Sequence, residues 1–166
     1  QVVTVQGVVT GVVRHGFFIQ EPEPSPDPLV SDAVFVFSPK WRAPQDALLK
    51  VSGKVVDFVK QENGKPVTQI KLADMRLLKQ RGSEIKPFEL TADNVPADVV
   101  ELAVFLNGLE GMLVSIEAGQ TFIAPSNPFG DYVLCLDADG PVTDVPRTEQ
   151  GGVLIDHQNP LRWYPG

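Results

Sequence analysis

The feature that most constrains this chain is its opening stretch, Val2–Val13, which is rich in β-branched residues and contains interior glycines. β-Branched side chains favour strands, and a glycine inside a strand marks a bend or a bulge. Small closed barrels need a long, strongly curved strand of this kind. Gly7 and Gly11 therefore predict a bent first strand that can take part in closing a barrel.

Four more strand patterns follow at short intervals. Arg14-His15-Gly16 is a tight connection that predicts a hairpin, and Asn63-Gly64 is the strongest two-residue hairpin signal. Glycine and proline number 14 and 15 among 166 residues, which suits short strands and turns better than long helices. The strands expected after the first are 17–20, Ala33–Phe37, 48–60 and 68–78. Together they predict a mainly all-β fold that opens with a five-stranded OB-like barrel over residues 1–88.

Residues 89–166 predict a smaller β-rich region with one short helix. The helix is expected at about 96–107, because Pro96 suits a first turn and Gly108 suits the residue just past the end. Cys135 lies in an apolar strand pattern and is expected to be a small buried hydrophobe. The expected strands are 112–116, Thr121–Ala124 and 132–136, with an edge strand near 153–155.

Charge is distributed unevenly along the chain. The net charge of −7 argues against broad, non-specific attraction to nucleic acid. Residues 1–90 carry 12 basic and 10 acidic side chains, whereas residues 91–166 carry 2 and 11. Within the first half, residues 40–86 hold 11 basic and 5 acidic side chains. A cationic surface is therefore expected in that segment, with ordinary solvated lysines as the alternative.

Several classes of protein are excluded or disfavoured. A single cysteine excludes an internal disulfide, and no stretch approaches 18 apolar residues, so no membrane span is expected. The chain has only two histidines, no GxSxG motif and no GxxxxGK loop, so no catalytic residue is predicted. It begins at Gln1 without a charged-then-apolar leader, and we expect it to be a piece of a longer protein.

No metal ligand or cofactor is predicted, and calcium is the alternative. Asp137-Ala138-Asp139-Gly140 begins like a calcium loop but lacks the later acidic positions. The proline-rich loop of residues 21–32 could also gather carboxylates around calcium, although its prolines alone explain an ordered acidic loop.

Four groups of short segments carry a resemblance to a known family. In chain order they are VQGVVT at 5–10; GFFIQE at 16–21 with SDAVFV at 31–36; VSGKVVDF at 51–58 with TQI at 68–70; and LEGMLV at 109–114 with FG at 129–130. In this order they resemble the region upstream of the catalytic domain in bacterial extracellular nucleases. In that family an OB-fold domain precedes a catalytic domain of the endonuclease/exonuclease/phosphatase type.

The resemblance implies a role without catalysis. Metal-binding acids and catalytic histidines belong to the family's downstream domain, and nothing in this chain matches them. The chain is therefore expected to be a DNA-binding OB-fold module of a secreted bacterial nuclease, located outside the cell or at its surface. Its expected partners are DNA or RNA, bound weakly, and a downstream catalytic domain of the same polypeptide.

The candidate binding residues are rings and cations. OB-fold barrels bind oligonucleotides on strands 2 and 3, where bases stack on aromatic rings and phosphates meet long cationic side chains. Strand alternation places Phe18, Phe35 and Phe37 outward if Phe17 and Val36 face the core. The predicted nucleic-acid-binding residues are Arg14, His15, Phe18, Phe35, Trp41, Arg42, Lys50 and Lys54.

Each candidate has an ordinary alternative. Arg14 and His15 could form an exposed turn, and the lysines could protect a strand edge. The rings could cover a second hydrophobic layer that packs on the C-terminal half. The competing hypothesis is therefore a structural or interaction domain that packs on its own enzyme or a surface partner and binds no nucleic acid. A carbohydrate-binding barrel rests on fold analogy alone.

Overall fold

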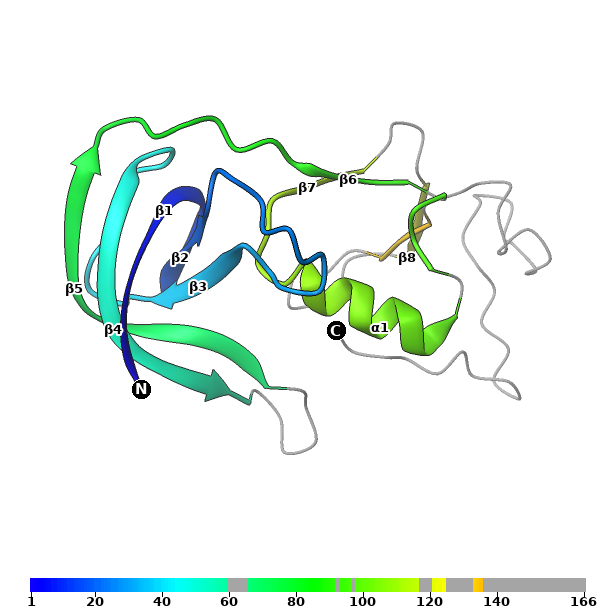
Figure 1. Cartoon of the computed structure of the whole chain (residues 1–166), viewed down its shortest axis with the longest axis horizontal. Coiled ribbons are helices and arrows are strands. Elements are labelled where there is room, and N and C mark those ends of the chain that lie inside the picture. Colours follow the sequence, from blue (N-terminus) through cyan, green and yellow to red (C-terminus); the bar gives the residue numbers. More distant parts are fainter. Residues whose placement is uncertain (60–65, 92, 97, 117–120, 125–132, 136–166) are drawn as a thin grey trace. The chain divides into compact units, whose positions relative to one another are not determined.

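The computed structural model describes residues 1–59, 66–91, 93–96, 98–116, 121–124 and 133–135. It confirms a mainly β fold with one short helix. Five strands form a closed barrel, which is the sheet drawn from blue to green in Figure 1. These strands are β1 (Val2–Val13), β2 (Gly16–Gln20), β3 (Ala33–Phe37), β4 (Leu48–Phe58) and β5 (Val67–Lys79).

The barrel closes because its long first strand pairs on both sides. The strand order is β1-β2-β3-β5-β4, and β1 also pairs with β4. Residues Val2 to Val8 of β1 pair with β4, and the later part pairs with β2, with a register shift between Val9 and Gly11. All neighbours are antiparallel except β3 and β5, which are parallel. The predicted curved first strand is therefore the element that closes the ring.

The core consists of the inward-facing side chains of the barrel strands. Phe17, Val36 and Leu49 are fully buried, and Ile70 is 2% exposed. Because successive strand residues point to opposite faces, the neighbours of these residues point outward. Phe18 and Phe35 are only half-buried, as this alternation requires. The inward row thus fixes which side chains the barrel can present to a ligand.

Strands β4 and β5 approach most closely at Gly53. A Cβ at this position would lie 2.3 Å from the Lys71 carbonyl oxygen and 2.6 Å from a methyl carbon of Ile70. The β4–β5 register shifts beside it, between Ser52 and Gly53. β5 continues past this shift to Lys79, close to the end predicted at residue 78.

The helix α1 (Val99–Gly108) begins three residues later than Pro96, where it was expected to start. Asp98 is its N-cap and accepts hydrogen bonds from the backbone N–H groups of Val100 and Glu101 at 2.9 and 3.0 Å. A carboxylate at this position satisfies donors that the first turn leaves free, so it sets the start of the helix. Gly108 is the last helical residue, so the helix ends one residue later than the predicted end at about 107.

The remaining strands are short. β6 (Phe88–Leu90) pairs with β7 (Val114–Ile116), and β8 (Thr121–Ala124) pairs with β9 (Val133–Cys135). Three of the four overlap strands expected from the sequence, and β6 was not predicted. The edge strand expected near 153–155 lies outside the described residues.

Two compact units make up the chain. One contains Gln1–Phe88 with Pro96–Val114, and the other contains Glu89–Val95 with Ser115–Gly166. The first unit therefore joins the barrel to α1. The domain boundary expected between residues 88 and 89 stays a prediction. Within the part of the chain that is described, no helix has the length and apolar character needed to span a bilayer.

Candidate nucleic-acid interface

An aromatic pair lies on the outer face of β2 and β3. The Phe18 and Phe35 ring centroids are 5.0 Å apart, and the ring planes are tilted by 52°. The two residues are partners in the β2–β3 register, beside the inward pair Phe17 and Val36. This ring pair joins two of the aromatic residues that the sequence singled out as base-stacking candidates.

Glycines leave room for both rings. A Cβ on Gly16 would lie 2.5 Å from Cζ of Phe35 and 2.2 Å from the Val36 carbonyl oxygen. A Cβ on Gly11 would lie 3.5 Å from Cδ2 of Phe18, an ordinary contact distance. Gly16 therefore leaves the space that the Phe35 ring occupies, whereas a side chain at position 11 would not collide with Phe18.

The ring pair lines a groove of about 430 Å³. Strands β3 and β5 supply one part of the lining, through residues such as Val34 and Thr68. The loop before β3 and the end of α1 supply the other part, through residues such as Leu29 and Asn107. An apolar groove with a few polar groups at its edge is typical of ligand sites.

The wall on the α1 side is held by specific contacts. The Ser31 hydroxyl donates to the Glu110 carbonyl oxygen at 2.6 Å. The side-chain oxygen of Gln20, which is 4% exposed, accepts a hydrogen bond from the Leu113 backbone N–H at 2.8 Å. Gly111 has a φ of 75°, and a Cβ there would lie 3.4 Å from Cδ1 of Phe18. The segment that follows α1 therefore covers part of the ring pair.

The predicted residues of the β1–β2 turn lie near Trp41. The His15 carbonyl oxygen accepts a hydrogen bond from the Ser38 N–H at 2.9 Å, and the Ser38 hydroxyl donates to the Trp41 carbonyl oxygen at 2.7 Å. Arg14, His15 and Arg42 are exposed, and Trp41 is 47% exposed. The structure thus gathers these four predicted residues around one end of β2 and β3.

Lys50 and Lys54 lie elsewhere, on the outer face of β4. In the barrel order, β4 adjoins β1 and β5 and does not touch β2 or β3. Across β5, Lys50 is the partner of Arg76, and Lys54 is the partner of Lys71. We call these four residues the cationic face. Asp74, opposite Ser52, lies between the two pairs, so the face with Asp74 has an excess of three positive charges.

Lys71 connects the cationic face to the rings. It is the partner of Phe37 in the parallel β3–β5 register, and Phe37 is the partner of Gly16 across β2. Because register partners share a face, Phe37, Lys71 and Lys54 form one outward row beside the ring pair. Lys71 and Arg76 were not among the predicted residues. The antiparallel β4–β5 register brings both beside predicted lysines, and the parallel β3–β5 register also brings Lys71 beside Phe37.

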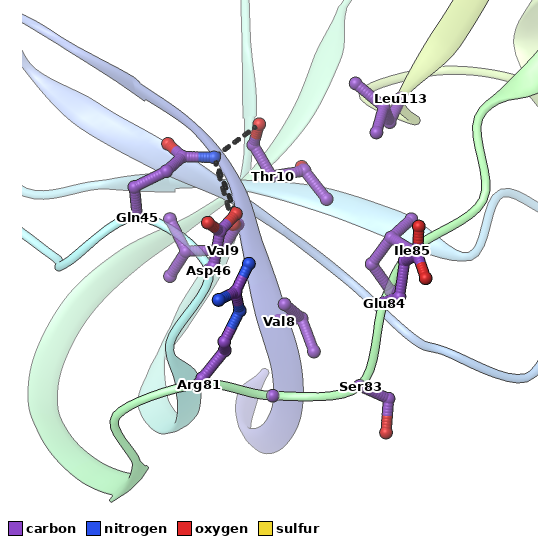
Figure 2. A pocket seen from close by; sticks show the side chains of 11 residues that line it. Val8, Val9, Thr10, Gln45, Asp46, Arg81, Ser83, Glu84, Ile85 and Leu113 are labelled. Atoms are coloured by element: carbon purple, nitrogen blue, oxygen red, sulfur yellow. Dashed lines mark hydrogen bonds between the residues drawn. The ribbon is translucent and has the colours of Figure 1, made fainter.

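A second cavity, of about 470 Å³, lies beside the bend of β1 (Figure 2). Its polar lining includes both Arg81 and Glu84, and Figure 2 shows the Arg81 side chain extending toward Asp46. Asp46 has a φ of 63°, in the left-handed region, and its carboxylate accepts a hydrogen bond from the Gln45 side chain at 3.3 Å. None of the residues predicted to bind nucleic acid lines this cavity.

The acidic loop of residues 21–32 uses its carboxylates for its own backbone. Asp32 accepts a hydrogen bond from the Ser25 N–H at 2.8 Å, and Asp27 accepts one from the Leu29 N–H at 3.0 Å. No group of three or more His, Cys, Asp or Glu side chains placed to hold a metal ion occurs among the described residues. The second calcium candidate, at 137–140, lies outside them.

Comparison with known proteins adds no relative. No family model, curated protein or solved structure matches the chain.

Proposed function

We propose that this chain is a non-catalytic nucleic-acid-binding module whose ring pair stacks bases. The observation that carries the proposal is the Phe18–Phe35 pair, with centroids 5.0 Å apart, in a groove on β2 and β3. This is the face that OB-type barrels use for oligonucleotides. Stacking of one base on an aromatic side chain is worth about 1–3 kcal/mol.

The surroundings of the groove support the same proposal. Arg14 and His15 are exposed at the β1–β2 turn, in the region where such barrels place a ligand-binding loop. Trp41 adds an exposed ring near that turn, where the Ser38 side chain and backbone hydrogen-bond to the Trp41 and His15 carbonyl oxygens. Cations and rings on one side of a barrel are the two groups that single-strand binders combine.

The proposed context is a secreted bacterial nuclease in which this module positions DNA for a downstream endonuclease/exonuclease/phosphatase domain. The resemblance of the four sequence segments supports this part of the proposal. Phosphodiester hydrolysis would then belong to the downstream domain. Determining the residues encoded after Gly166 tests this part, and the absence there of a domain with metal-binding acids and catalytic histidines contradicts it.

Fluorescence anisotropy of a labelled oligonucleotide at low salt tests the binding itself. We expect the double variant Phe18→Leu/Phe35→Leu to weaken binding at least tenfold, since two stacking contacts are lost. Phe105→Leu is the matched control, because its ring packs against Phe88 at 5.9 Å and does not line the groove. Absence of binding by the unaltered chain at high micromolar concentration ends the proposal.

A structural or interaction domain is the second candidate. The observation that favours it is that the chain's own segment after α1 already covers part of the ring pair, through the Gln20 and Ser31 contacts. If this candidate is correct, Phe18→Leu/Phe35→Leu lowers the unfolding temperature and leaves every binding isotherm unchanged.

A further inference from the structure

The parallel pairing of β3 with β5 extends the candidate interface beyond the ring pair. We propose that the ligand is a single strand of nucleic acid that crosses from the ring pair over β5, where Lys71 and Lys54 bind its phosphates. This inference rests on the proposed function and names the substrate class and two positions of contact. Lys71 has no role in the sequence-based prediction.

The spacing of the strands supports this path. Phe35 is the register partner of Gln69, and Lys71 is two residues further along β5. Neighbouring strands are about 4.8 Å apart, and two residues along a strand span about 6.6 Å. The Lys71 Cα therefore lies about 8 Å from the Phe35 Cα. A flexible lysine side chain at this distance can meet the phosphate of a nucleotide whose base stacks on the ring.

The charges on β4 and β5 also require an explanation. Like charges directly opposite each other on neighbouring strands destabilise a sheet, by roughly 0.2–1 kcal/mol for a pair. This arrangement occurs twice here, at Lys50 with Arg76 and at Lys54 with Lys71. The intervening carboxylate of Asp74 balances one of the four charges. A polyanion lying over the face removes the remaining repulsion, so charge complementarity favours a phosphate backbone.

The rings select a single strand over a duplex. A base can stack on Phe18 or Phe35 only if it has left its neighbours in the stack, and duplex bases have not. A ligand held by the cations alone would show no such preference, because phosphates are present in both forms. The combination of the ring pair with Lys54 and Lys71 therefore predicts both a strand preference and a salt-dependent affinity.

The experiment compares Lys54→Gln/Lys71→Gln with Lys79→Gln in the whole chain. Lys79 is exposed on the same strand, about 26 Å along β5 from Lys71, so it controls for the loss of one positive charge away from the proposed path. Each variant is titrated with a labelled single-stranded oligonucleotide, its duplex and a sulfated polysaccharide, between 50 mM and 500 mM salt.

Losing two phosphate contacts should lower the slope of log affinity against log salt by about 1.4 for the single strand. If the variant and the unaltered chain bind equally at 1 M salt, this change in slope makes the variant bind about 25-fold more weakly at 0.1 M salt. The unaltered chain should bind the single strand more tightly than the duplex. Lys79→Gln should change both the salt slope and the affinity less than the double variant does.

The outcomes separate this inference from the proposed function. If the unaltered chain binds none of the three probes, both the proposed function and this inference are wrong. If Phe18→Leu/Phe35→Leu weakens binding but the lysine double variant behaves like Lys79→Gln, only the inference falls. If the lysine variant loses the polysaccharide and both nucleic acids equally, and the ring variant loses none of them, the face is a general polyanion surface and the inference is overturned.

Discussion

The two sides of this barrel share one core but differ in chemistry. On β2 and β3, the outward residues include the Phe18 and Phe35 rings. Gly16 leaves space for the Phe35 ring, and the chain's own segment after α1 covers part of the ring pair. On β4 and β5, the outward residues include four cations, which oppose one another in two like-charged pairs. One side is optimised for packing, whereas the other retains repulsion that lowers stability.

This contrast shows how a small barrel can divide its surface. The inward side chains of all five strands contribute to one core cluster, with partly buried residues such as Val34 and Leu72 packed against it, so the shared core stabilises both sides. Only the outward residues differ, and these are the residues that a ligand meets. Substitutions at Gly16 or Gln20, which shape the surroundings of the rings, should therefore affect folding first, and a substitution on the cationic side should affect binding first.

The largest expected effect is on the ring side, at Gly16. Gly16→Ala places a Cβ where the Val36 carbonyl oxygen is 2.2 Å away, and backbone cannot move aside cheaply. We expect a loss of about 3 kcal/mol in the free energy of unfolding, at the upper end of overpacking costs. Denaturant unfolding measures it. Gly11→Ala is the control, since its Cβ would make an ordinary 3.5 Å contact, and equal losses in both variants contradict the account.

An intermediate effect is expected at Gln20. Gln20→Leu removes the acceptor of the Leu113 N–H and leaves a part-buried donor without a partner, which costs about 1–3 kcal/mol. Amide hydrogen exchange should show faster exchange at Leu113. Gln45→Leu is the control, because Gln45 is exposed and water can replace its bonds to the Val9 and Thr10 carbonyl oxygens. Unchanged exchange at Leu113 in Gln20→Leu would show that this contact does not hold the segment.

The smallest effect is on the cationic side, and it has the opposite sign. Lys71→Glu turns a like-charge pair with Lys54 into an opposite-charge pair, so stability should rise by about 0.2–1 kcal/mol at low salt. The gain should disappear near 1 M salt, where the screening length is about 3 Å. Thermal unfolding at the two salt concentrations measures it, with Lys79→Glu as the control. A loss of stability at low salt contradicts the idea that this face retains repulsion.

Much of the barrel could be predicted because its signals are local. Alternation and turn residues placed β2 and β3 almost to the residue, and the glycines of β1 indicated the bend that closes the ring. The start of α1 was less accurate, because the side chain of Asp98 caps the helix more strongly than Pro96 initiates it. Gly108 was expected beyond the helix end, but it serves a close approach: a Cβ there would lie 2.5 Å from the Pro28 carbonyl oxygen.

The candidate site was less predictable than the fold. Alternation within one strand was enough to place Phe18 and Phe35 outward, and their partnership across β2 and β3 became visible only in the structure. Lys71 could not be found in this way, because its neighbour Phe37 is 34 positions earlier and the pairing is parallel. Local pattern carries no information about such a register, so the position of Lys71 beside Phe37 could not be predicted.

The same late pairing has a consequence for synthesis of the chain on the ribosome. β3 and β4 are each completed before β5 exists, and in the finished barrel β5 lies between them. Until β5 emerges, both strands have an unpaired edge, and such edges can pair with other chains. A nascent chain stalled before Val67 would therefore expose two unpaired strand edges that can aggregate. The last strand of the barrel is thus also the strand that protects the chain from aggregation.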